Sequence, residues 1–249
     1  MLAPAISFIK PAGIALSLLL TSAVWAGEEG TGSKPFELTT SVYQLAGGDV
    51  PRGLGLDVNL QHSSGLGNVS LGWYRAPEQE ISQTRLGWDR SYTLGPVRLM
   101  PSLQVASGGF WGGSAAVETG DSWFVGLGLG RTNLREYNSP NFDSNDAWTL
   151  SGGYRWGDDD SLSLQVVRDN RQHPDQQHVH LTYRTPLSGD QRLTVDVLSK
   201  TGLVEGAQIQ RLGFSLGYDW PRYFVRLAYD PLVNFSTQDM WRLSVGTRF

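Results

Sequence analysis

The sequence predicts an all-β chain that closes into a single antiparallel transmembrane β-barrel of about 14 strands, with 12 as the alternative. Two observations carry this prediction. Apolar and polar residues alternate along most of the 249-residue chain, and the links between the alternating segments are short and longer in turn. Alternation with a period of two gives a strand one apolar and one polar face. A barrel in a membrane turns the apolar face to lipid and encloses the polar face.

The first 26 residues are expected to be a secretory signal peptide. They contain one cation, Lys10, an apolar stretch over residues 14–20 and a small-residue cleavage site that ends at Ala26. The apolar stretch is shorter than the roughly 20 residues of a spanning helix, although a retained membrane anchor is the alternative. Residues 27–35 are predicted to be a flexible lead-in, and residues 36–249 to form the barrel.

Alternating segments follow one another after Pro35, and no stretch of helical period competes with them. Their apolar positions include Leu54, Leu56, Val58 and Leu60 in one segment, opposed by Gly55, Asp57, Asn59 and Gln61. The same pattern is found over residues 69–73, 97–105, 123–129, 148–156, 162–166, 179–183, 193–197, 212–218, 225–229 and 241–249.

The links between these segments predict which membrane side each end of a strand faces. Short turns rich in Gly, Pro, Asp and Ser are expected at SSGLGN, TLGP, ETGDS, GDDDS, LSGDQ and DWPR. Longer links are expected at AGGDVPRG, APEQE, SGGFWGGS, NLREYNSPNFDSNDA, RDNRQHPDQQ, TGLVEG and LVNFSTQD. Outer-membrane barrels have short periplasmic turns and longer extracellular loops. Treating SGGFWGGSAAVETGDS as one loop gives the count of 12 strands.

Aromatic residues gather near the predicted strand ends, where their amphipathic rings suit the membrane interface. A secreted β-sandwich, the alternative all-β fold, does not require aromatics at so many strand ends. These residues are Trp73, Trp88, Tyr154, Trp156, Tyr218, Trp220, Tyr223, Tyr229 and Trp241.

The last segment, MWRLSVGTRF, ends on Phe249 with apolar residues at most alternate positions before it. Together with the signal peptide and the alternation, it resembles the Gram-negative outer-membrane β-barrel proteins, which include the porins. The resemblance implies a location in the cell outer membrane and contact with outer-membrane lipid. It also implies that the barrel-assembly machinery is a partner, which would read Phe249, Thr247, Val245, Leu243 and Trp241. Thr247 is polar where that family more often has an apolar residue.

The enclosed face is where function is expected, and its composition leans towards arginine. Arginines along a wet channel raise the local concentration of anions and bind carboxylates or phosphates. We therefore expect a channel for passive diffusion of small, anionic solutes such as acidic saccharides. The candidate pore-lining residues are Arg85, Arg98, Arg155, His178, His180, Arg184, Arg192, Asp196, Arg211, Arg226, Asp230, Arg242 and Arg248.

A closed barrel that serves structure, adhesion or assembly with partners is the alternative function. Inward Arg and Asp residues facing each other would then form a stiffening ladder. In the hairpin around LSGD, for example, Thr182 is expected across from Asp196. Inward glycines and a circumference of about 14 strands favour a water-filled pore instead.

Enzymatic and nucleic-acid functions are not favoured by the sequence. No cysteine is present, which excludes disulfides and thiolate chemistry, and the formal net charge is −4, with no run of like charges that suggests a nucleic-acid partner. His178 and His180 share the inward face and suggest a base or a metal pair, but no lipid-facing serine accompanies them as a lipid hydrolase would need. We expect no enzyme activity, no cofactor, no metal site and no nucleic-acid partner, and an outer-membrane lipid-modifying enzyme is the less favoured alternative function.

Overall fold

The computed structural model describes residues 34–48, 52–139, 146–157 and 159–249. The predicted signal peptide and most of the lead-in lie outside these described residues. The described residues form fifteen strands and two 3₁₀ helices: β1 (Phe36–Ala46), β2 (Gly53–Ser64), β3 (Gly67–Ala76), η1 (Pro77–Gln79), β4 (Ile81–Asp89), β5 (Tyr92–Leu94), β6 (Val97–Ala106), β7 (Phe110–Thr119), β8 (Trp123–Thr132), β9 (Ala147–Trp156), β10 (Asp160–Asp169), β11 (Gln177–Leu187), β12 (Gln191–Val204), β13 (Ala207–Asp219), β14 (Tyr223–Asp230), η2 (Val233–Phe235) and β15 (Asp239–Arg248).

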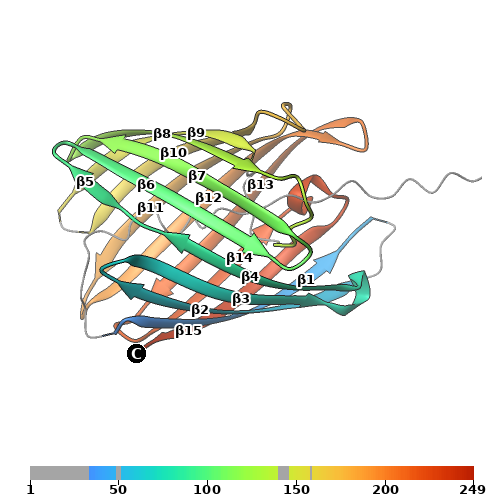
Figure 1. Ribbon diagram of the computed structural model, residues 1–249, viewed down its shortest axis with the longest axis horizontal. Coiled ribbons are helices and arrows are strands. Elements are labelled where there is room, and N and C mark those ends of the chain that lie inside the picture. The colour runs from blue at the N-terminus through green and yellow to red at the C-terminus, as the bar shows by residue number, and fades with distance from the viewer. Residues whose placement is uncertain (1–33, 49–51, 140–145, 158) are drawn as a thin grey trace, which may run out of the picture.

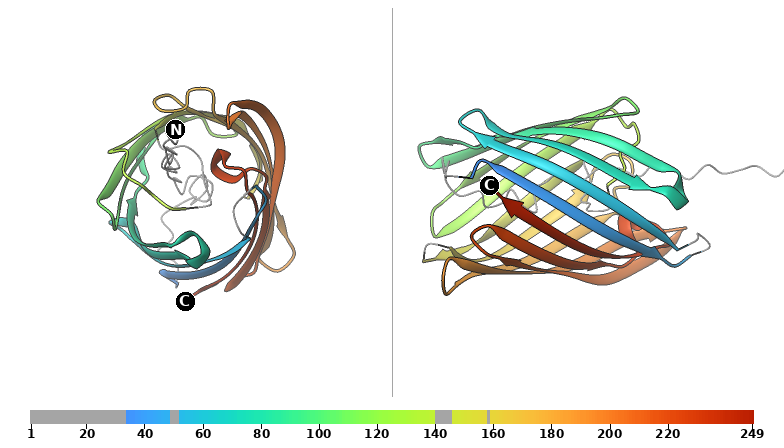
Figure 2. Two further views of the ribbon diagram at one scale, coloured as in Figure 1. Left: turned by 90° about the vertical axis from the view of Figure 1, so that its right-hand side faces the viewer. Right: turned by 90° about the horizontal axis from the view of Figure 1, so that it is seen from below.

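The strands form one closed antiparallel barrel (Figure 1). Apart from β4 and β5, which both pair with β6 and not with each other, each strand pairs with its neighbours in the sequence. The barrel closes where β1 pairs with β15, from Glu37 with Arg248 to Ala46 with Asp239. Closure gives each strand of the wall a partner on both sides, which a β-structure in lipid requires because no water is present to satisfy the backbone. Figure 2 shows the closed ring of strands end-on.

The predicted strand number of 14 is confirmed. Short β5 follows β4 along the same side of β6: β4 pairs with Ser102–Ala106 and β5 with Val97–Leu99. The two together fill one position in the wall, so fifteen segments make a barrel of 14 strands. The alternative of 12 strands is wrong, because residues 110–119 form the complete strand β7 between β6 and β8.

The faces of the strands are inverted relative to a water-soluble protein. Apolar side chains on the outer face are exposed, among them Leu127 at 62% and Leu212 at 66%, whereas Asp57 and Lys200 on the enclosed face are 6% and 0% exposed. Exposed apolar surface that continues around the barrel is stable only against lipid. Within the described residues, no helix is long and apolar enough to cross a membrane.

Aromatic side chains gather on the outer face near the ends of the strands, as predicted. Near the short turns, rings on β8, β9 and β11 follow one another: Trp123 lies 4.6 Å from Tyr154, and Trp156 lies 6.2 Å from Tyr183. Near the opposite end, Tyr229 and Trp241 lie 4.8 Å apart. These rings suit the two interfaces of a membrane.

The links differ in length between the two ends of the barrel, although two predicted loops are wrong. At one end every link spans two or three residues, and at the other the links at 47–52, 133–146, 170–176 and 231–238 are longer. The predicted loop SGGFWGGS is reduced to residues 107–109, because Phe110–Gly113 pair within β7. The predicted loop TGLVEG is mostly strand, and only Glu205 and Gly206 link β12 to β13.

Two glycines in short turns both have a positive φ but differ in the space around them. A Cβ atom on Gly120, which has a φ of +101°, would lie 2.1 Å from the Trp123 carbonyl oxygen, whereas nothing lies within 4 Å of a Cβ on Gly95, which has a φ of +61°. We therefore expect Gly120→Ala to lower the free energy of unfolding by about 1–3 kcal/mol and Gly95→Ala to have a smaller effect. Urea titration of the barrel refolded in lipid vesicles measures both, and equal effects would contradict the prediction.

Candidate functional site in the barrel lumen

The candidate pore-lining residues from the sequence lie on the enclosed face of the barrel, which we call the lumen. Paired residues of an antiparallel sheet point to the same face. Arg184 pairs with buried Ser161, and Arg211 pairs with Lys200, whose side chain is fully buried. The predicted pairing of Thr182 with Asp196 is confirmed.

Arginines from β11, β12, β14 and β15 form one group in the lumen, the arginine cluster, which consists of Arg184, Arg192, Arg226, Arg242 and Arg248. Arg184 and Arg226 lie on one row of paired residues that runs through Thr194 and Gly217. Their charges repel each other, and Arg226 is also repelled by Arg242 and Arg248. Gly217 adds no side chain to this row, so Thr194 alone has a side chain between the two arginines.

Two carboxylates balance part of the arginine cluster. Arg248 donates to Asp219 at 2.6 Å and to Glu37 at 2.9 Å, and Arg192 lies 3.8 Å from Asp219. Among the described residues, neither Arg184 nor Arg226 has a carboxylate within ion-pair distance; the Arg226 guanidinium instead lies 4.3 Å over the Phe224 ring. The cluster therefore keeps an excess of positive charge on one side of the lumen.

Across the lumen, basic and acidic residues are matched more closely. Arg155 donates to Glu118 at 2.7 Å, and Arg98 lies 3.5 Å from the same carboxylate. Arg85 forms an ion pair with Asp57. These ion pairs join neighbouring parts of the wall, as expected if facing basic and acidic residues stiffen the barrel. The excess of basic residues therefore lies on β11–β15.

The link from residue 133 to residue 139, after β8, folds against the inside of the wall. The Gln83 amide nitrogen donates to the Glu136 carbonyl oxygen at 3.1 Å, and the Asn138 backbone N–H donates to its amide oxygen at 2.8 Å. Tyr137 is buried against Phe110, with ring centroids 4.7 Å apart, and burial raises the pKa of its phenol. This segment narrows the lumen at the end with the longer links.

A second inward segment, residues 231–238, is held by a buried cation. Lys200 Nζ donates to Asp230 Oδ1 at 2.5 Å and to the carbonyl oxygens of Pro231 and Leu232, both at 3.1 Å. Val233 packs in an apolar cluster with Tyr43, Leu45, Tyr74, Ala76 and Met240. Its helix η2 lies inside the ring of strands in the end-on view of Figure 2.

The two inward segments meet. Asn234 Nδ2 donates to the Ser139 carbonyl oxygen at 3.3 Å, across 95 residues of sequence. Links from opposite parts of the chain thus join inside one end of the barrel, and a solute would have to pass beside them before it reached the arginine cluster.

The two histidines have structural contacts. His180 Nδ1 lies 3.0 Å from Asp196 Oδ1, and Thr182 donates to the other oxygen of that carboxylate at 2.7 Å. His178 stacks on Phe235, with ring centroids 5.2 Å apart and planes 8° apart. Within the described ranges, no group of three or more His, Asp or Glu side chains is placed to hold a metal ion.

Sequence reasoning missed the residues that shape the narrow end. Lys200, Gln83, Tyr137 and Phe235 were not among the candidate site residues. Lys200 carried a signal, because lysine occurs only three times in the chain and this one alone falls within a predicted strand. A lone lysine on an enclosed face needs an anionic partner, and Asp230 ends a nearby strand.

No protein-family model and no curated protein sequence matches the chain. Among solved structures, it is similar to the outer membrane protein Omp33 of Acinetobacter baumannii, with a TM-score of 0.51, 12% identity, and coverage of 87% of this chain and 98% of that one. A NanC porin (TM-score 0.46, 10% identity, 85% and 100% covered) and a mutant Rh. blastica porin (0.46, 10%, 86% and 99%) are less similar. The likeness to Omp33 confirms that the chain has the fold of an outer-membrane β-barrel.

Proposed function

We propose that the protein is an outer-membrane channel for the passive diffusion of small anionic solutes. The single observation that carries this proposal is the arginine cluster, in which Arg184 and Arg226 have no carboxylate of the described residues within ion-pair distance. A positive wall in a confined aqueous space attracts anions and repels cations. The positive sign of the wall charge therefore predicts selectivity for anions over cations.

Carboxylated solutes, such as acidic saccharides, suit this wall best. A guanidinium group binds a carboxylate through two parallel hydrogen bonds, and a row of such groups lets a solute move from one to the next. Arg184 and Arg226 keep donors that no carboxylate of the described residues uses. Weak binding at several positions permits both entry and release, which passive diffusion needs.

We also propose that the chain reaches the outer membrane by way of its signal peptide and the barrel-assembly machinery, and that it works without a cofactor or an enzymatic step. The exposed apolar face and the aromatic rings near both ends support a membrane location. His180 contacts the Asp196 carboxylate and His178 stacks on Phe235, and these contacts support a structural role for both histidines.

A closed barrel is the second candidate, and the two inward segments favour it. The contact of Asn234 with Ser139 narrows the lumen from two sides. The same geometry in a channel would restrict the size of the solute. Conductance of the purified protein separates the two functions.

Planar-bilayer recordings test the proposal. In a KCl gradient, the reversal potential should show preference for chloride, and Arg226→Gln with Arg242→Gln should lower that preference several-fold, because two lumen charges are lost. The matched control is Arg75→Gln with Arg168→Gln, which removes two exposed arginines from the outer face. The control should retain the selectivity of the unmodified protein.

Absence of reproducible conductance from the folded protein would reject the channel and favour the closed barrel. Conductance without anion preference, or an unchanged preference in the Arg226 and Arg242 variant, would reject the anionic solute while leaving the channel in place.

A further inference from the structure

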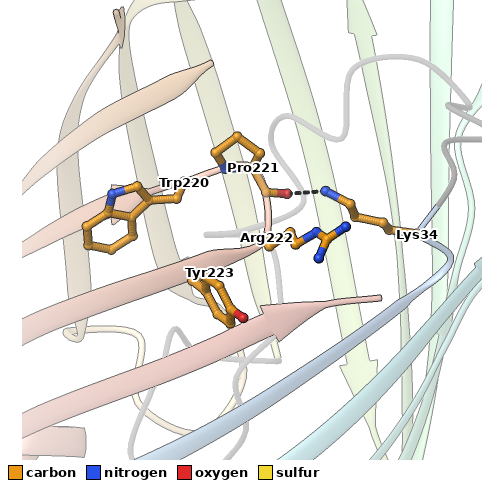
Figure 3. A pocket seen from close by; sticks show the side chains of 5 residues that line it. All are labelled: Lys34, Trp220, Pro221, Arg222 and Tyr223. Atoms are coloured by element: carbon orange, nitrogen blue, oxygen red, sulfur yellow. Dashed lines mark hydrogen bonds between the residues drawn. The ribbon is translucent and has the colours of Figure 1, made fainter. Parts of the chain in front are cut away.

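We propose that the rim at the short-turn end carries a binding site for the phosphate headgroup of an anionic phospholipid. An open groove of about 470 Å³ lies there, lined by Lys34, Trp220, Pro221, Arg222 and Tyr223. It joins the start of the chain described by the structure to the turn between β13 and β14 (Figure 3). The inference does not depend on whether the lumen conducts.

The groove has two cationic groups and no carboxylate among its lining residues. Lys34 Nζ donates one hydrogen bond to the Pro221 carbonyl oxygen at 2.8 Å, which fixes the ammonium group beside the turn and leaves two of its protons for a ligand. Figure 3 shows the Arg222 guanidinium extending towards Lys34. An ammonium and a guanidinium group placed together suit a phosphate, because both donate charge-assisted hydrogen bonds to its oxygens.

Backbone hydrogen bonds hold in place the turn that carries Arg222. The Arg222 carbonyl oxygen accepts from the Arg248 backbone N–H at 2.7 Å, and the Trp220 N–H donates to the Tyr223 carbonyl oxygen at 2.8 Å. The turn is therefore tied both to its own hairpin and to the last strand. A rigid turn loses little conformational freedom when it binds a ligand.

The aromatic residues place the groove at the depth of lipid headgroups. Trp220 is 40% and Tyr223 is 59% exposed, and the Trp220 ring lies 4.5 Å from the Tyr218 ring on the outer face. Such rings mark the boundary between hydrocarbon and headgroups. Arg222 lies on the turn just beyond that boundary, at the depth of the phosphates of one leaflet, and the Lys34 ammonium group lies beside the turn through its bond to Pro221. A lipid in this position can bring acyl chains to the apolar wall and its phosphate to Lys34 and Arg222.

An anionic lipid fits better than a zwitterionic one. The lining residues supply two positive charges and no negative charge, so a headgroup that adds its own ammonium group would meet repulsion. Basic residues near a membrane surface select anionic lipids by the same physics.

Native mass spectrometry of the full-length mature protein, released from detergent micelles and titrated with phosphatidylglycerol, tests the site. We expect one tightly bound lipid per barrel and weaker binding of phosphatidylcholine. Lys34→Gln with Arg222→Gln should weaken phosphatidylglycerol binding about thirty-fold, the effect of removing two basic contacts to an anionic lipid surface.

The control variant is Arg52→Gln with Arg135→Gln, which removes two exposed arginines from links at the opposite end and should keep the lipid affinity. Arg222→Gln alone changes an exposed turn and keeps the test valid if the double variant folds poorly. This single change should weaken phosphatidylglycerol binding roughly five-fold, because one basic contact is lost. Equal affinity in the unmodified protein and in a folded Arg222→Gln variant would overturn the proposal, as would equal affinity for the two lipids.

Discussion

Lys200→Met is expected to release residues 231–238 from the lumen and to raise the single-channel conductance. Lys200 is fully buried and donates to the Asp230 carboxylate, at the end of β14, and to two carbonyl oxygens of that segment. Methionine fills a similar volume but leaves Asp230 and both carbonyl oxygens without their donor. Removal of one partner from a buried ion pair lowers the stability by about 3–5 kcal/mol. The loss is smaller if residues 231–238 leave the wall, because their carbonyl oxygens can then accept hydrogen bonds from water.

Two measurements follow the release directly. The first is the single-channel conductance. The second is the maleimide labelling rate of Ser236→Cys, a specific reporter because the chain has no other cysteine. Labelling should accelerate when Lys200→Met is added to the reporter.

Arg211→Met is the matched control, because it removes the same charge from the residue that pairs with Lys200 on the adjacent strand. Among the described residues, the Arg211 side chain donates to the Gln210 carbonyl oxygen and not to residues 231–238. Arg211→Met should leave the labelling rate unchanged. Labelling and conductance that stay the same in Lys200→Met would show that the apolar contacts of Val233 and Phe235 hold the segment without the buried ion pair.

The wall of the barrel could be predicted because its determinants are local. A period of two residues fixes which side chains face lipid, and it placed Thr182 opposite Asp196 once the hairpin turn was located. Two links were misplaced for a local reason as well. Glycines suggested a loop at residues 107–114, yet Gly112 lies where a Cβ atom would come within 3.0 Å of Thr132, and it serves close packing inside the wall.

The interior of the narrow end could not be predicted, because long-range contacts determine it. Gln83 binds a segment more than fifty residues later, and Asn234 binds Ser139 across 95 residues. The sequence of a loop has no periodic pattern from which such long-range contacts can be predicted. The same limit applies to the arginine cluster: the sequence placed each arginine inward, but which ones Asp219 and Glu37 neutralise depends on the register of five strands.

Phe249→Ala is expected to reduce the amount of folded barrel in cells far more than it reduces the stability of the folded protein. Phe249 closes the barrel against Phe36: their backbone groups exchange two hydrogen bonds of 3.0 Å, and their rings stack with centroids 5.7 Å apart. Alanine keeps the hydrogen bonds and removes the stack, a loss of about 1 kcal/mol beyond the buried area. A larger effect in cells would come from recognition of the terminal aromatic during assembly.

Phe36→Ala separates closure from recognition, because it removes the same ring contact from the other side and leaves the carboxy-terminal aromatic in place. Refolding into detergent followed by urea titration should give a loss for Phe36→Ala at least as large as for Phe249→Ala, because the Phe36 ring also lies 4.7 Å from the His62 ring. Heat-modifiable mobility of outer-membrane fractions should show a several-fold deficit of folded protein for Phe249→Ala alone, and Phe249→Tyr should restore it. If both alanine variants are depleted equally in cells, the ring of Phe249 serves closure of the barrel, and its proposed role in contact with the assembly machinery is wrong.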